Sequence, residues 1–193
     1  MPYINYDKQE IAFKIVYFGP GMSGKTTNLI KIHEILDPQK CSEMVVLDTE
    51  EERTLFFDFL PFDLGSICGF SVRFNMYTVP GQVQYEASRK LILDGADGVV
   101  FVADSHPSKR EENLLSYQMM TENFVSHGFD PVTYPLVLQF NKRDLDQVMN
   151  ISEMNASLNK GGHKTFEAVA LKGQGVIETI KEVSKQIVTR FEI

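Results

Sequence analysis

Short apolar runs alternate with longer amphipathic segments along most of the chain. Short apolar runs are typical of buried strands, whereas apolar positions three and four apart are typical of helices. This pattern predicts strands at residues 13–18, 44–48, 54–60, 70–78, 98–103, 136–140 and 165–170. It predicts helices at residues 25–36, 85–93, 110–125 and 176–191. We expect residues 54–60 and 70–78 to be joined by a turn near Gly65-Ser66.

Apolar strands that alternate with amphipathic helices indicate a mostly parallel sheet covered on both faces. We therefore predict an α/β fold whose central sheet has about six strands flanked by helices. No internal repeat, low-complexity tract or linker interrupts the pattern, so residues 1–193 are expected to form one domain. The most polar stretches, residues 37–43 and 145–163, are expected to be surface connections.

Composition narrows the range of partners. The net charge of −7 disfavours nucleic acid as the main partner, because phosphate backbones need a basic surface. A bound nucleotide needs only a local cluster of donors and is not disfavoured. No apolar run reaches the length of a membrane span, and neither a myristoylation glycine nor a prenylation cysteine is present. With only two cysteines, we expect a cytoplasmic protein without a direct lipid anchor.

Residues 19–26 match the phosphate-loop pattern G-x-x-x-x-G-K-[ST] between a predicted strand and a predicted helix. Glycines let the backbone wrap a phosphate, and the helix dipole favours an anion there. Lys25 is expected between the β- and γ-phosphates, and the Thr26 hydroxyl on Mg²⁺. A chance match in such a chain has a probability on the order of 1% or less. The residues expected around the phosphates are Gly19, Gly21, Met22, Ser23, Gly24, Lys25, Thr26 and Thr27.

Residues 141–144 read Asn-Lys-Arg-Asp, an N-K-x-D motif directly after a predicted apolar strand. Open α/β sheets bind ligands at the carboxyl ends of their strands. The Asp144 carboxylate can accept from guanine N1–H and its exocyclic amine, but would repel the N1 acceptor of adenine. The Lys142 stem can lie along the base, and Asn141 can tie this loop to the phosphate loop. A turn or capping role for Asp144 is the alternative, which the co-occurring phosphate loop disfavours.

A third base-contacting stretch is expected after the next strand, at Val169-Ala170-Leu171. The backbone N–H of Ala170 is the expected donor to the guanine oxygen, with Val169 beside it. Packing of a buried strand explains the same side chains equally well.

Residues 78–82 read Thr-Val-Pro-Gly-Gln at the end of a predicted strand. Typical GTPases carry Asp-x-x-Gly-Gln here, where the glycine contacts the γ-phosphate and the glutamine orients the attacking water. Gly81 and Gln82 are kept, but Thr78 cannot supply the negative charge that supports Mg²⁺. Metal binding is therefore weaker, or an acid such as Asp48 substitutes. A plain turn is the alternative for Pro80-Gly81.

Arg53 and Thr54 follow a run of three glutamates. Thr54 is placed to complete the Mg²⁺ shell when a γ-phosphate is present. Arg53 could reach the γ-phosphate as a built-in arginine finger. A solvated arginine paired with the neighbouring glutamates explains its position equally well.

Five stretches of the chain are distinctive: Pro20-Gly21 and the segments at residues 52–61 (ERTLFFDFLP), 78–82 (TVPGQ), 88–93 (SRKLIL) and 140–145 (FNKRDL). Together they resemble the bacterial mutual gliding-motility protein A family, small Ras-like GTPases that set cell polarity and motility. The resemblance runs over essentially the whole chain. Thr78, unusual among GTPases in general, is a feature of this family.

The resemblance implies a Rossmann-like P-loop NTPase fold of the small-GTPase type that hydrolyses GTP slowly to GDP. It implies catalytic roles for Arg53, Gln82 and Lys25, and Mg²⁺ held by Thr26 and Thr54. It further implies a homodimeric roadblock-fold activator (MglB-like), GTP-state effectors of polarity and motility, and recruitment to a cell pole through partners.

Two other functions are compatible with the residues. One is a catalytically silent scaffold that GTP orders, with Thr78 marking lost hydrolysis. The other is an ATP-using P-loop kinase or ATPase, which the Asp144 carboxylate disfavours. Single-turnover hydrolysis separates the first from a GTPase, and competition between GTP and ATP separates the second.

Overall fold

The computed structural model describes residues 2–36, 48–49, 53–54, 59–67, 69–80 and 86–191. Its strands are β1 (Tyr3–Asn5), β2 (Glu10–Phe18), β3 (Asp48–Thr49), β4 (Arg53–Thr54), β5 (Phe59–Ile67), β6 (Phe70–Thr78), β7 (Gly98–Asp104), β8 (Leu136–Asn141) and β9 (Lys164–Glu167). Its helices are α1 (Lys25–Ile35), α2 (Glu86–Leu93), α3 (Arg110–Ser126), α4 (Ile151–Leu158) and α5 (Val176–Phe191), with 3₁₀ turns η2 (Pro107–Lys109) and η3 (Ala170–Lys172).

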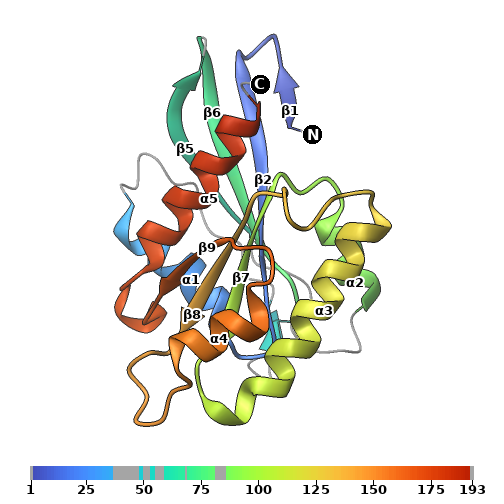
Figure 1. Ribbon diagram of the computed structural model, residues 1–193. Helices are drawn as coiled ribbons and strands as arrows, with labels where there is room; N and C mark the ends of the chain where they lie inside the picture. Colours follow the sequence, from blue (N-terminus) through green and yellow to red (C-terminus); the bar gives the residue numbers. More distant parts are fainter. Residues whose placement is uncertain are drawn as a thin grey trace.

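The main sheet has the strand order β5-β6-β2-β7-β8-β9, with β1 added beside β2 (Figure 1). Strands β6, β2, β7, β8 and β9 pair in parallel, whereas β5 and β1 pair antiparallel to their neighbours. The predicted α/β fold with a mostly parallel sheet is therefore confirmed. Because the five parallel strands share one direction, their carboxyl ends meet at one edge, where open α/β sheets bind ligands.

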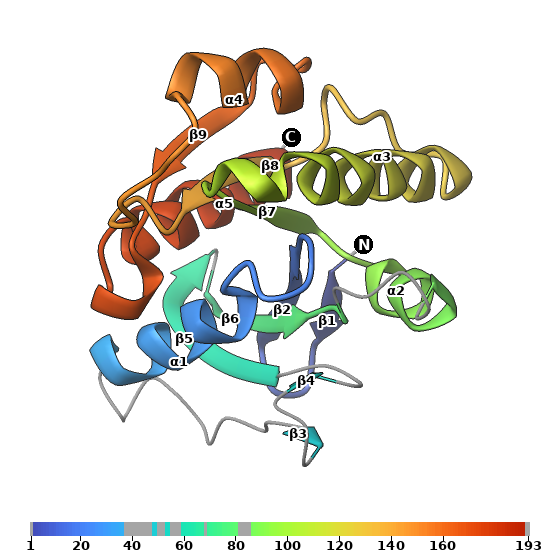
Figure 2. The same ribbon diagram turned by 90° about the horizontal axis from the view of Figure 1, so that it is seen from below.

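Helices cover both faces of this sheet (Figures 1 and 2). On one face, α1 and α5 pack through Leu29, Ile32 and Val183 onto apolar side chains of β2, β6 and β7. On the other face, side chains of α2, α3 and α4 pack onto β2, β7 and β8. Every residue of β7 and of β8 is buried, as expected for central strands covered on both faces. The central strands therefore hold their carboxyl ends in fixed positions.

The structure corrects the predicted hairpin. Strand β5 continues to Ile67, so the predicted strand end at residue 60 and the turn near Gly65-Ser66 are wrong. The register of β5 on β6 shifts between Asp63 and Gly65, so Gly65 belongs to a bulge inside the strand. The chain reverses at Gly69, whose φ of 87° suits glycine. Most of the predicted strand at residues 44–48 lies outside the described residues.

Two further predictions on the carboxyl-terminal half are wrong. The stretch 145–163 contains α4, which the Asn150 side chain caps by accepting from the Ser152 N–H at 2.9 Å. Met154 and Leu158 are buried and the half-buried Ile151 packs beside them, but a helix of 8 residues is too short to give a strong periodic signal. The predicted strand 165–170 ends at Glu167, and the chain then enters η3.

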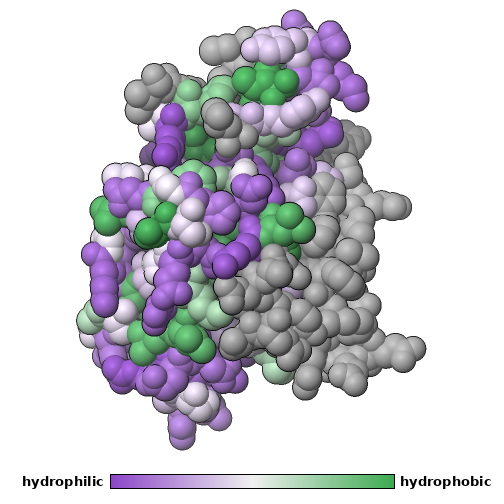
Figure 3. Space-filling view, turned by 90° about the vertical axis from the view of Figure 1, so that its right-hand side faces the viewer, coloured by the Kyte–Doolittle hydropathy of each residue, from purple (hydrophilic) through white to green (hydrophobic). Residues whose placement is uncertain are grey.

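The surface that carries α2 and α3 is mostly hydrophilic where it is described, and its apolar side chains lie in small separate groups (Figure 3). None of the helices in the described part of the chain is long and apolar enough to cross a membrane.

A close approach between β7 and α5 gives a test of the packing. A methyl group on Gly98 would lie 2.7 Å from Ile187 Cδ1 and 3.0 Å from Val183 Cγ2. Gly98→Ala should therefore lower the free energy of unfolding by about 1–3 kcal/mol, the usual cost of overpacking. Urea titration measures it. In a double-mutant cycle, Ile187→Ala should recover part of the loss, whereas strictly additive costs would contradict this packing.

Candidate functional site

The phosphate-loop motif connects the carboxyl end of β2 to α1 and is packed against neighbouring strands. A Cβ on Gly19 would lie 2.2 Å from the Val102 carbonyl oxygen of β7. Gly24 has a φ of 100°, and a Cβ there would lie 2.2 Å from Asn141 Nδ2 at the end of β8. A side chain at Gly19 would therefore overlap the backbone of β7, and one at Gly24 would be strained at that φ and would displace the Asn141 amide.

The described groups of this loop fit a phosphate. Gly24, the N-cap of α1, offers no side-chain cap, and the first turn carries no acidic residue. The N–H groups of a first helical turn have no partner within the helix. The Ser23 hydroxyl is buried and has no hydrogen-bond partner among the described residues. The loop therefore concentrates donors where a helix dipole favours an anion.

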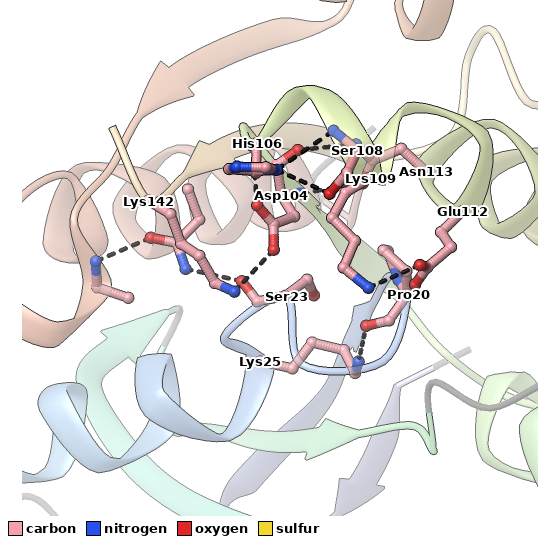
Figure 4. Close-up of polar contacts among 12 residues, drawn as sticks. Pro20, Ser23, Lys25, Asp104, His106, Ser108, Lys109, Glu112, Asn113 and Lys142 are labelled. Carbon is pink, nitrogen blue, oxygen red and sulfur yellow. Dashed lines mark hydrogen bonds and ion pairs between the residues drawn. The ribbon is translucent and has the colours of Figure 1, made fainter. Parts of the chain in front are cut away.

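Lys25 adds a positive charge inside the loop. Lys25 is only 7% exposed, and its ammonium donates to the Gly19 carbonyl oxygen at 3.0 Å. It also donates to the Pro20 carbonyl oxygen at 2.7 Å (Figure 4). Both acceptors belong to the loop that the lysine follows. The ammonium is thus held in the curve of the loop, where it can meet the oxygens of a bound phosphate.

Asn141 joins two loops at the end of β8. Its Nδ2 donates to the Ser23 carbonyl oxygen at 2.8 Å, and its Oδ1 accepts from the Ala170 N–H at 2.9 Å. The predicted tie to the phosphate loop is therefore present. The asparagine also connects to the loop after β9, a contact that the motif alone did not predict. Because the Ala170 N–H has a partner here, its donation to a guanine oxygen stays a prediction.

Lys142 is held by an acid that the sequence analysis missed. Its ammonium lies 2.7 Å from Asp104 Oδ2, and Asp104 is only 2% exposed (Figure 4). Asp104 Oδ1 accepts from the His106 N–H at 2.9 Å, and the Asn113 side chain bonds the Asp104 backbone. Asp104 ends β7 as Asn141 ends β8, and its position after an apolar strand was the available signal.

Asp144 is exposed beside these residues. Its Oδ2 lies 3.0 Å from the ammonium of Lys172 in η3. This hydrogen bond holds the pKa of the Asp144 carboxyl below its usual range. The carboxylate is therefore an ionised acceptor at neutral pH, as the reading of guanine requires.

The switch residues are only partly described. Thr78 is fully buried at the end of β6, where it pairs with Tyr17 of β2. Arg53 and Thr54 form β4, whose backbone register sets Thr54 opposite Asp48. Gly81 and Gln82 lie outside the described residues. The structure therefore leaves the roles of Arg53, Thr54 and Gln82 as predictions.

No group of three or more His, Cys, Asp or Glu side chains that could hold a metal occurs within the described ranges. Mg²⁺ retains several waters and commonly uses substrate phosphates, so it does not need such a cluster. The Thr26 hydroxyl, in the first turn of α1, is compatible with that kind of site.

Comparison with known proteins decides the family. The model of the ADP-ribosylation factor (Arf) family matches residues 3–187. The chain belongs to the Arf family of small GTPases. Over 192 residues this Arf-family chain is 48% identical to "Mutual gliding-motility protein MglA" of Myxococcus xanthus, covering 100% of this chain and 98% of the relative. The resemblance seen in the sequence is thereby confirmed.

More distant Arf-family relatives come from nematodes. "ADP-ribosylation factor-like protein 6" of Caenorhabditis elegans is 26% identical over 186 residues, covering 92% of this chain and 88% of the relative. The protein of that name from Caenorhabditis briggsae is 24% identical over 181 residues, covering 90% and 85%.

Asp144→Asn tests the reading of the base. The amide replaces an acceptor with a donor, so GTP should bind about 100-fold or more weakly. Xanthosine triphosphate should gain affinity, because xanthine carries a carbonyl acceptor where guanine carries its amine. Competition against a fluorescent guanine nucleotide measures both. Asp146→Asn, the same change at an exposed neighbour, is the matched control. Unchanged guanine preference in Asp144→Asn would contradict the assignment.

Proposed function

We propose that this Arf-family GTPase binds GTP with Mg²⁺, hydrolyses it slowly to GDP and thereby switches between two partner-binding states. The observation that carries the proposal is the pair of hydrogen bonds made by Asn141. They connect the phosphate loop, which suits an anion, to the loops expected to read guanine. One ligand that spans both halves accounts for this connection.

In this proposal the chain's own residues stabilise the charge that develops during in-line attack of water on the γ-phosphate. Lys25 and Arg53 neutralise charge on the transferring phosphoryl group, and Gln82 orients the attacking water. Thr26 and Thr54 would hold Mg²⁺, which supplies further charge neutralisation when bound. Gly81 donates its N–H to the γ-phosphate, which couples the nucleotide state to the switch segments.

The biological setting is proposed from the relative. The protein that is 48% identical is named for gliding motility, and its coverage extends over the whole chain. We infer a switch in bacterial polarity and motility, activated by a homodimeric roadblock-fold (MglB-like) partner. Effectors bind the GTP state, and the cytoplasmic protein reaches a cell pole through these partners.

Competition between GTP and ATP tests the nucleotide directly. Purified protein is loaded with a fluorescent guanine nucleotide, and either triphosphate is added with Mg²⁺. Displacement by GTP at far lower concentration than by ATP is expected, because Asp144 repels the adenine N1. Equal displacement by both would overturn the proposed nucleotide.

Lys25→Ala should abolish retention of nucleotide while the fold is kept, because the ammonium of Lys25 donates to carbonyl oxygens of its own loop. Nucleotide extracted after gel filtration is quantified by chromatography, and circular dichroism checks the fold. Lys31→Ala, which removes a partly exposed lysine of the same helix that pairs with Glu34, is the control. Full nucleotide content in Lys25→Ala would exclude the phosphate-loop assignment.

Arg53→Ala should keep near-normal GTP affinity yet lose activated hydrolysis, because a finger meets the γ-phosphate only in the transition state. Arginine fingers contribute about 10³–10⁵ in rate. Single-turnover hydrolysis with the roadblock-fold partner measures the loss. Arg73→Ala, which removes an arginine paired with Glu10 in the main sheet, is the matched control. If Arg53→Ala hydrolyses GTP at the wild-type rate in the presence of the partner, Arg53 is a surface arginine without a catalytic role.

A further inference from the structure

Three buried polar side chains form a continuous hydrogen-bonded network beneath the nucleotide site. Asn28 of α1, Gln139 of β8 and Thr179 of α5 are each 0% exposed. The two amides face each other: Asn28 Nδ2 donates to Gln139 Oε1 at 2.8 Å, and Gln139 Nε2 donates to Asn28 Oδ1 at 2.9 Å. Gln139 Nε2 also donates to Thr179 Oγ1 at 3.1 Å. The network therefore connects two helices through one central strand.

At each end of this network a side chain donates a hydrogen bond to a glycine carbonyl. One glycine ends the phosphate loop, and the other ends the loop that contains Ala170. Asn28 Nδ2 donates to the Gly24 oxygen at 2.9 Å, the last glycine of the phosphate-loop motif. The Thr179 hydroxyl donates to the Gly175 oxygen at 2.6 Å, at the end of the loop that contains Ala170. Every side-chain donor of the three residues is thus used, and each bond has a defined direction.

The surroundings make these bonds strong. Leu29, Ile32, Val137, Val176 and Val183, on the same elements, belong to a buried apolar cluster. Hydrogen bonds in such a low-dielectric environment are stronger than in water, and a fully satisfied network makes its neighbourhood rigid. Leaving one member unpaired is correspondingly costly.

The network is not needed to satisfy the backbone. The Gly24 oxygen also accepts from the Asn28 N–H at 3.0 Å, and the Gly175 oxygen from the Thr179 N–H at 3.2 Å. Apolar side chains could therefore fill the same space without leaving either carbonyl unpaired. What the polar side chains add is a fixed direction and distance between the two loops.

Gln139 and Asn141 lie two residues apart on β8, and both bond to partners on the α1 and α5 side of the sheet. Asn141 joins the loops directly, and Gln139 joins the first turns of the helices that follow them. We propose that Asn28, Gln139 and Thr179 are positioning residues that set the phosphate loop relative to the base-reading loops. This inference rests on the proposed binding of a guanine nucleotide.

A variant that replaces all three by apolar residues separates positioning from stability. In Asn28→Leu/Gln139→Leu/Thr179→Val no polar partner stays unpaired, and replacing both partners of a hydrogen bond can be nearly neutral for stability. We expect a urea midpoint close to the wild type but dissociation of fluorescent GDP at least about tenfold faster, because small misplacements of binding groups are costly. An unchanged dissociation rate in a stable variant would overturn the proposal.

If the triple variant does not fold, single substitutions at Thr179 test the proposal. Thr179→Val removes the hydroxyl with little change in shape, and Thr179→Ser keeps it. Faster GDP release in the first and wild-type release in the second support positioning, whereas equal rates in both overturn it.

Asn123→Leu is the control, because it removes a buried amide of α3 whose side chain, among the described residues, bonds to the Met119 carbonyl of its own helix alone. It should leave GDP release unchanged, and faster release there would count against a specific role for the three residues. The proposed function fails separately, if the wild-type protein itself does not retain guanine nucleotide.

Discussion

The two loops proposed to contact opposite ends of one nucleotide need a fixed separation, and in this protein hydrogen bonds from strand β8 impose it. Asn141 bonds to the phosphate loop through Ser23 and to the following loop through Ala170. Because β8 is buried on both faces, its end cannot shift without disturbing the core. The glycines of the phosphate loop follow from this constraint, since a side chain on Gly24 would collide with the Asn141 amide.

The need for fixed positions also accounts for the ion pair between Lys142 and Asp104. Lys142 would be free to swing on its long stem, but buried Asp104 holds its ammonium at 2.7 Å. Asp104 is in turn fixed by hydrogen bonds with His106 and Asn113. Fixing these groups before the ligand arrives lowers the entropy lost on binding.

Sequence reasoning proposed site residues where chemistry demands particular residue types. The phosphate loop, Asn141 and Asp144 were proposed as nucleotide contacts, because glycines, an amide and a carboxylate at those spacings serve few purposes besides holding a nucleotide. Of these expectations, the tie from Asn141 to the phosphate loop is present in the structure. Asp104 and the Asn28–Gln139–Thr179 network were missed, because their meaning depends on which strands and helices become neighbours. The bulge at Gly65 was misread for a similar reason, since a glycine favours a turn and a bulge alike.

If Asp144 reads guanine as proposed, its ion pair with Lys172 gives the base a competitor for the carboxylate. The net gain on binding guanine is then the gain from its hydrogen bonds to the carboxylate less whatever part of the ion pair is lost. Dissolved salt screens exposed pairs of this kind and frees the carboxylate, while it also screens the attraction between the phosphate loop and the nucleotide. In the proposed site, the base-reading half and the phosphate-binding half would therefore respond to ionic strength in opposite directions.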